Sequence, residues 1–175
     1  LDEIPCGKYG TLDRYVPDGD YIVIKFARWA FEKFKGVEDK LGTQMRAVGE
    51  VMSIGKNYKE AFQKAIRSLE IGRYGLGFAK DFHEKSKEEL LHMLHTATSE
   101  RQFIMYETLR KGATVEQLHE LTKIKVHFIQ EMKELVDEEQ EILAYASEHP
   151  GDQLPEDQFI TAKKDGFSDR YLGQL

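Results

Sequence analysis

Cysteine is nearly absent from this sequence, since Cys6 is the only one among 175 residues. A disulfide within the chain is therefore impossible, and a single thiol is typical of a cytosolic protein. Long apolar runs are missing too, because none approaches the roughly 20 residues that a membrane-spanning helix needs. No charged segment followed by an apolar one opens the chain as a signal peptide would. We therefore expect a cytoplasmic protein with no membrane partner.

Positive charge is also in short supply, because 25 Lys and Arg face 31 Asp and Glu, for a net charge of −6. An acidic chain argues against a nucleic-acid partner. The charge is uneven: residues 1–70 hold 12 basic and 11 acidic residues, whereas residues 71–175 hold 13 and 20. This change coincides with the glycine-rich run Ile71–Gly77. We therefore predict two domains, 1–72 and 73–175.

The residue patterns of phosphoryl-transfer sites are missing. Gly72, Gly75 and Gly77 are not followed by a Lys-Ser/Thr pair at the spacing of a phosphate loop, so they do not form one. No set of carboxylates meets the pattern that magnesium requires beside transferred phosphates. We therefore predict no catalytic, cofactor-binding or metal-binding residue in this chain. Because the chain begins with Leu1 and not with Met, we expect it to be a piece of a longer protein.

The first 70 residues combine strand and helix patterns. Residues 1–19 are rich in turn formers and predict a loop. Tyr21–Phe26 is β-branched and aromatic, which predicts a strand that is buried on both faces or lies inside a sheet. Its expected partners are Val51–Ile54 and further strands upstream. Asn57 and Glu60 predict a capping box, in which Glu60 reaches back to the Asn57 amide, at the start of an amphipathic helix.

Everything after Gly77 indicates helix. Ser86 with Glu89 and Thr114 with Gln117 are spaced as capping boxes, and no strand pattern occurs in this part. About six helices with short connections predict an all-α domain. The fold class that we expect is mainly α: a short α+β part followed by an all-α part.

These elements occur in a recognisable order. YIVIKF and ARWAFEKF are followed by QMRAVGEVMSIG and NYKEAFQKAIRSLE, and then by GATVEQLHELTKIKVHFIQEMKELV in the helical part. The order resembles the large chain of carbamoyl-phosphate synthetase along nearly the whole sequence. The resemblance implies that residues 1–72 end the first, carboxyphosphate, ATP-grasp domain and that residues 73–175 form the helical oligomerization domain. Ala27 stands where the family usually has proline, and Ala47 where it has serine.

The resemblance also implies a parent activity. The family makes carbamoyl phosphate from bicarbonate, glutamine-derived ammonia and two ATP, with Mg or Mn, for arginine and pyrimidine synthesis. Its nucleotide clamps and metal ligands lie upstream of the residues matched here, so this fragment of a carbon–nitrogen ligase is expected to be inactive alone. The implied partners are the rest of the large chain, a glutaminase small subunit and other large chains.

Glu50, with Met45 beside it, is the one functional position that the resemblance carries over. In the family, the segment written here as QMRAVGE borders the internal passage of the carbamate. A carboxylate there can hydrogen-bond a small polar intermediate or order water molecules. The alternative is a structural carboxylate paired with Arg28 or Arg46, because buried acids are normally paired.

Leu90, Leu91 and Leu94 form an apolar stripe on one predicted helix. In a small helical domain, such a stripe packs either in the core or in an interface. The oligomerization domain of the family implies a self-association surface, with Leu90 as its foremost residue. Packing into the domain's own core is the equal alternative.

Other patterns favour structural interpretations. Glu89, His92 and His95 have the spacing of metal ligands on a helix, but no matching carboxylates occur elsewhere, so a solvated face is favoured. The acidic run from Asp137 to Glu141 is likewise interpreted as a solvated face. An aromatic cluster is interpreted as core and not as a binding surface for single-stranded nucleic acid; it comprises Phe26, Trp29, Phe31 and Phe34. A free-standing all-α interaction domain is the alternative for the whole chain.

Overall fold

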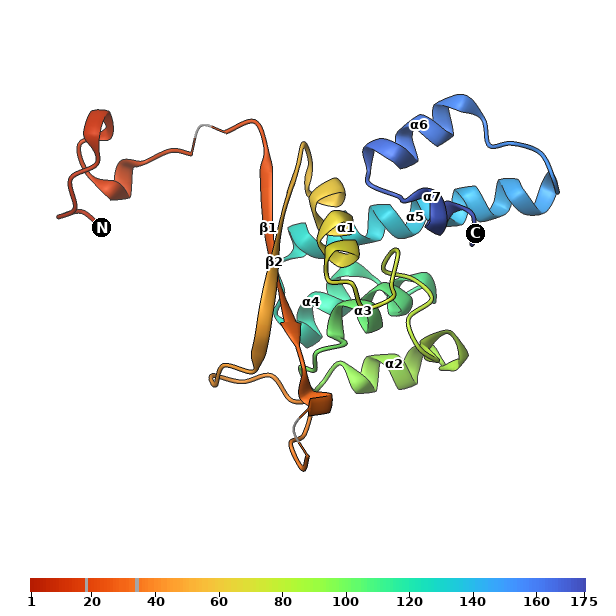
Figure 1. The fold of residues 1–175 in the computed structure, drawn as a ribbon, viewed down its shortest axis with the longest axis horizontal. Helices are drawn as coiled ribbons and strands as arrows, with labels where there is room; N and C mark the ends of the chain where they lie inside the picture. The colour runs from red at the N-terminus through yellow and green to blue at the C-terminus, as the bar shows by residue number, and fades with distance from the viewer. Residues whose placement is uncertain (18, 34) are drawn as a thin grey trace.

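Seven α-helices and one pair of strands make up the part of the chain that the computed structural model describes, residues 1–17, 19–33 and 35–175 (Figure 1). The strands are β1 (Ile22–Trp29) and β2 (Ala47–Gly55). The helices are α1 (Tyr58–Ser68), α2 (Lys87–Met93), α3 (Arg101–Arg110), α4 (Val115–Thr122), α5 (Val126–Glu148), α6 (Glu156–Lys164) and α7 (Asp169–Leu172). The predicted class, mainly α with a short α+β part, is confirmed.

The strand pair stands beside the helices, and the segment before it extends away from them on the far side (Figure 1). β1 pairs antiparallel with β2, so that Phe26 lies opposite Val51 and Ile24 opposite Ser53. The expected pairing with Val51–Ile54 is therefore confirmed. Burial of β1 on both faces is wrong for this chain, because Val23 is 45% exposed and no third strand is present among the described residues.

Helix α1 covers the inner face of the strand pair. Asn57 caps it by accepting a hydrogen bond from the Glu60 amide at 2.8 Å. Glu60 accepts a hydrogen bond from the Lys56 amide at 2.6 Å and not from the Asn57 amide that the capping-box pattern predicts, and its other carboxylate oxygen pairs with Lys64 at 2.5 Å. The Ser53 hydroxyl donates to the Ala61 carbonyl at 2.6 Å and ties strand to helix.

Helix α3 lies among the other helices and is buried on all sides (Figure 1). Every residue from Phe103 to Leu109 is buried, so this helix has no solvated face along that stretch. Ile129, Met132, Leu135, Val136 and Ile142 of α5 are buried in the core, whereas Phe128, which belongs to the same apolar side in the sequence pattern, is 41% exposed. No helix among the described residues is long and apolar enough to cross a membrane.

Glu139 on α5 is the completely buried carboxylate of this core, at 0% exposure. Its Oε2 accepts hydrogen bonds from the Tyr106 and Tyr171 hydroxyls, each at 2.6 Å. Its Oε1 lies 3.1 Å from Nε of Arg110. The interpretation of the acidic run as a solvated face is therefore wrong for Glu139, whose partners lie on α3 and α7. Burial and the nearby carboxylate raise the pKa of both tyrosines, so both hydroxyls keep their protons for this bond.

The glycine-rich run contacts the same group of side chains. The Gly77 amide donates to the Tyr171 hydroxyl at 3.1 Å. A Cβ atom at Gly77 would lie 2.1 Å from that oxygen, and one at Gly75 would lie 2.7 Å from the Tyr171 ring. Both positions therefore require glycine, and the run serves packing in this chain.

A Tyr171→Phe substitution tests this buried network. We expect a loss of about 1–3 kcal/mol in the free energy of unfolding, because Glu139 loses a donor and the Gly77 amide loses its acceptor. Urea denaturation followed by circular dichroism measures the loss. Tyr145→Phe is the matched control, because the Tyr145 ring stacks on His149 near the end of α5 and away from Glu139. Equal stability of the two variants would contradict the account.

Candidate functional site

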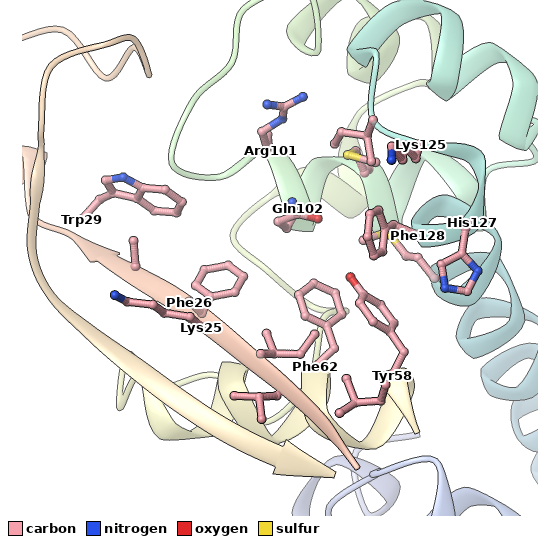
Figure 2. Close-up of a pocket in the computed structure, with 17 residues that line it drawn as sticks. Lys25, Phe26, Trp29, Tyr58, Phe62, Arg101, Gln102, Lys125, His127 and Phe128 are labelled. Atoms are coloured by element: carbon pink, nitrogen blue, oxygen red, sulfur yellow. The ribbon is translucent and has the colours of Figure 1, made fainter. Parts of the chain in front are cut away.

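A cleft of about 850 Å³ lies between β1 and the helices α1, α3 and α5 (Figure 2). Aromatic rings dominate its wall. The Tyr58 ring lies 5.5 Å from Phe62 and 5.4 Å from Phe128, between ring centroids. Phe26 continues this row from β1, at 6.0 Å from Phe62 and 5.9 Å from Trp29.

The polar groups around the cleft are mainly cationic. Arg101 and Lys125 line it together with the His127 ring, while the ammonium of Lys25, another lining residue, points away to Glu50 on the outer face of the strand pair; no Asp or Glu is among the lining residues. The Arg101 guanidinium donates to the Thr122 carbonyl at 3.3 Å, and burial lowers the pKa of Arg101. Burial and the nearby Glu131 raise the pKa of Tyr58 to about 12. A wall of this kind offers no carboxylate for acid–base work or for magnesium.

The strand beside the cleft has one edge free, because β1 pairs only with β2 among the described residues. A free edge presents unpaired backbone donors and acceptors, and the aromatic wall offers apolar contact beside it. A free edge beside an apolar wall is the arrangement with which a further strand of polypeptide can pair.

The two passage candidates lie outside this cleft. Met45 is 90% exposed in the loop before β2. Glu50 lies on the outer face of β2, with its side chain 58% exposed and 2.9 Å from Nζ of Lys25. The alternative partners were wrong: Arg28 donates to the Leu69 carbonyl at 2.8 Å, and Arg46 to the Gln44 side chain at 2.7 Å. Since successive side chains of a strand point to opposite faces, Lys25 shares the face of Glu50 and Arg28 does not.

The leucine stripe is divided between core and surface. Leu90 is 0% exposed and Leu94 is 4% exposed, and both pack in the core. Leu91 is only half-buried and lies beside Leu121 of α4 in a shallow depression. The self-association surface stays a prediction, and Leu91 is the member of the stripe on which it now depends.

Of the residues with the spacing of metal ligands, Glu89 and His92 lie on α2, and His95 follows its end. Glu89 accepts the Ser86 amide at 2.7 Å in the predicted capping box, and the His92 and His95 rings lie 5.8 Å apart between centroids. No group of three or more His, Cys, Asp or Glu in the described part of the chain is placed to hold a metal ion. Of the aromatic cluster, Phe26 and Trp29 pack at the core, while Phe34 lies outside the described residues.

The loop that carries Met45 is fastened to the helical part by contacts that sequence patterns did not indicate. Asp39 accepts hydrogen bonds from the Ser99 amide at 2.8 Å and the Ser99 hydroxyl at 2.5 Å. The Leu41 amide donates to the Ala97 carbonyl at 2.7 Å. Because about 60 residues separate these partners in the chain, no local pattern signals the contact. The loop before β2 is therefore positioned by the entrance to α3.

Comparison with known proteins defines the class and then the family. The family model described as "Carbamoyl-phosphate synthetase large chain, oligomerisation domain" matches residues 50–175. The helical part is thus an oligomerisation domain, which implies association with other chains. The match begins before the predicted boundary at residues 72 and 73, which stays a prediction.

Relatives match along the whole chain. The sequence is 42% identical to the carbamoyl phosphate synthase large chain of Archaeoglobus fulgidus, covering 100% of this chain and 16% of that protein. It is 38% identical to the large chain of Clostridium perfringens, again over 100% of this chain and 16% of the relative. It is 38% identical to the N-terminal section of the large chain of Methanopyrus kandleri, of which it covers 33%. This chain belongs to the carbamoyl-phosphate synthetase large chain family and spans a minor part of its relatives' length.

An Asp39→Ala substitution tests the fastening of the loop. We expect trypsin to cut faster after Lys40 and Arg46, because the two hydrogen bonds to Ser99 are lost, with about 1–2 kcal/mol of stability. Glu38→Ala is the matched control, since the neighbouring Glu38 is exposed. Unchanged cleavage of the Asp39 variant relative to this control would contradict the fastening role.

Proposed function

We propose that this chain is the structural and self-association segment of an ATP-dependent carbon–nitrogen ligase, carbamoyl-phosphate synthase. The observation that carries the proposal is the family match over residues 50–175, together with relatives of that name along the entire chain. The parent makes carbamoyl phosphate from bicarbonate, glutamine-derived ammonia and two ATP, in the cytoplasm, for arginine and pyrimidine synthesis. Its partners are a glutaminase small subunit and other large chains.

The unfinished strand pair supports the assignment of residues 1–72 to an ATP-grasp domain. Met52 is 71% exposed and Ile54 is 55% exposed on its outer face. Apolar side chains in such a position normally lie against other parts of a protein. The rest of the large chain would cover this face and the free edge of β1. A free-standing all-α interaction domain is not expected to carry a strand pair with uncovered apolar side chains. A segment of the large chain therefore explains this feature better.

The nucleotide and its metal are assigned to other parts of the large chain. ATP with Mg or Mn needs a phosphate-binding backbone and carboxylates that reach both metal and phosphate. The described residues do not fit this group, because the cleft beside β1 has no carboxylate and no metal-spaced cluster is formed. No step of the reaction is therefore assigned to side chains of this chain.

The outer face of the strand pair suits the wall of a passage. The ion pair of Lys25 and Glu50 lies among exposed apolar side chains, those of Val23, Met52 and Ile54. Once the rest of the large chain covers this face, the pair becomes a polar position in an apolar channel wall. Such a position can hydrogen-bond a small anion such as carbamate as it passes.

A Glu50→Ala substitution in the full-length large chain tests the passage role. We expect a severalfold fall in carbamoyl phosphate formed per ATP consumed, because carbamate escapes before the second phosphorylation. Bicarbonate-dependent ATP hydrolysis should be unchanged, since Glu50 takes no part in that step. Glu38→Ala in the same large chain is the control. A yield per ATP equal to that of the control would rule out the passage role.

A Leu91→Glu substitution tests the association surface. We expect a dimer dissociation constant at least about tenfold weaker, equivalent to about 1.4 kcal/mol, because a charge then replaces apolar contact. Sedimentation velocity over a concentration series measures it. Leu90→Glu would unfold the domain, since Leu90 is fully buried. Val126→Glu at an exposed site on α5 is the control, and equal association of the two variants would contradict a surface at α2.

A further inference from the structure

A second, smaller pocket lies at the joint between the strand pair and the helical part. Its volume is about 220 Å³, and its lining includes Arg28 near the end of β1 and Arg73 in the glycine-rich run. The space can hold several water molecules or one small ion, whereas pockets for cofactors and other larger ligands measure about 300 Å³ or more. Its size therefore favours a small ion over a nucleotide.

The Arg73 guanidinium is held in place and has a donor to spare. Its Cζ atom lies 3.8 Å from the centroid of the Phe103 ring, and its Nη2 lies 2.8 Å from Oε2 of Glu100. Its Nη1 is buried and has no hydrogen-bond partner in the described part of the chain. Buried donors in proteins normally have a partner, and a charged donor needs one most. Water or an anion in the pocket would supply the acceptor.

Arg28 brings a second guanidinium to the same pocket from the strand pair. Its Nη1 donates to the Leu69 carbonyl at 2.8 Å, just after α1, which holds the group at the pocket wall. A guanidinium carries five N–H donors, and this is the hydrogen bond that the Arg28 side chain makes to the described residues. Arg28 is exposed, so its remaining donors are open to a ligand.

Positive charge is in excess around this pocket. Glu100 is the carboxylate among the lining residues, and both of its oxygens are paired, one with Arg73 and the other with Nζ of Lys80 at 3.0 Å. Asp39 accepts hydrogen bonds from the amide and the hydroxyl of Ser99, a further lining residue. The two arginines and Lys80 are thus matched by two carboxylates. The remaining positive charge favours an anion over neutral water as the acceptor.

We propose that this pocket binds a small oxyanion of the size of phosphate, held between Arg28 and Arg73. A guanidinium presents paired N–H donors that match the oxygens of such an anion, and charge strengthens these hydrogen bonds. An anion held by both arginines connects β1 with the glycine-rich run and, through Phe103 beneath Arg73, with α3. Binding therefore fastens the strand pair to the helical part. The site does not depend on the activity proposed above.

Titration of this chain with sodium phosphate at pH 6.5 tests the site. NMR signals of the Nε–H groups report on each arginine separately. We expect the signals of Arg28 and Arg73 to shift and to saturate in the millimolar range of phosphate. Sodium chloride at the same ionic strength is the control and should give no saturating shift. Shifts that grow without saturation, or that saturate only at other arginines, would overturn the proposal.

Charge changes of opposite sign identify the binding residues. Arg28→Gln and Arg73→Gln should each weaken phosphate binding at least about tenfold, because each removes a charged pair of donors. Glu100→Gln should strengthen binding severalfold, because it removes the carboxylate that competes for Arg73. Arg14→Gln is the matched control, since Arg14 is exposed and does not line the pocket.

The surface position of Arg28 keeps the test decisive even if Arg73→Gln does not fold. Binding by Arg28→Gln that equals binding by Arg14→Gln would overturn the proposal. Weaker binding by Glu100→Gln than by the unchanged chain would also overturn it, because the competing carboxylate would then not lie at the site.

Discussion

The buried carboxylate of Glu139 is the constraint on which the helical part depends. An uncompensated charge in a protein interior costs several kcal/mol, so this side chain requires its partners. Tyr106 and Arg110 supply them from α3, and Tyr171 supplies one from α7. Meeting this requirement fixes the position of α5 against α3 and brings the C-terminal helix back to the centre. The glycine-rich run packs against the same side chains, since only glycine fits at position 77 beside the Tyr171 hydroxyl.

The strand pair, in contrast, is only partly covered by the rest of the chain. Its inner face is closed by α1 through Phe26, Phe62 and Ser53, but its outer face and the edge of β1 have no partner among the described residues. The helical part thus has a closed apolar core of its own, while the strand pair is covered on one face only. This difference accompanies a match to an oligomerisation domain over residues 50–175 and to relatives of which the chain spans a minor part.

Local sequence patterns predicted the helices and strands well, but they did not predict contacts between residues that are far apart in the chain. The spacing of Ser86 with Glu89 and of Thr114 with Gln117 predicted two capping boxes, and both are formed. Glu139 was interpreted as surface because its neighbours in the chain are acidic, yet its partners lie about 30 residues away on other helices. The partner of Glu50 was missed for a related reason: strand register, which the sequence leaves open, decides that Lys25 and not Arg28 shares its face.

Single-residue amide exchange of this chain by NMR is the most direct test of a closed helical core beside an unfinished strand pair. We expect the amides of Ile104 on α3 and Leu135 on α5, both buried, to exchange only through global unfolding. The amides on the free edge of β1 should exchange by local opening, many times faster. Addition of the rest of the large chain should then protect that edge. If the free-edge amides of β1 in this chain alone are as slow as those of α3, the account is contradicted.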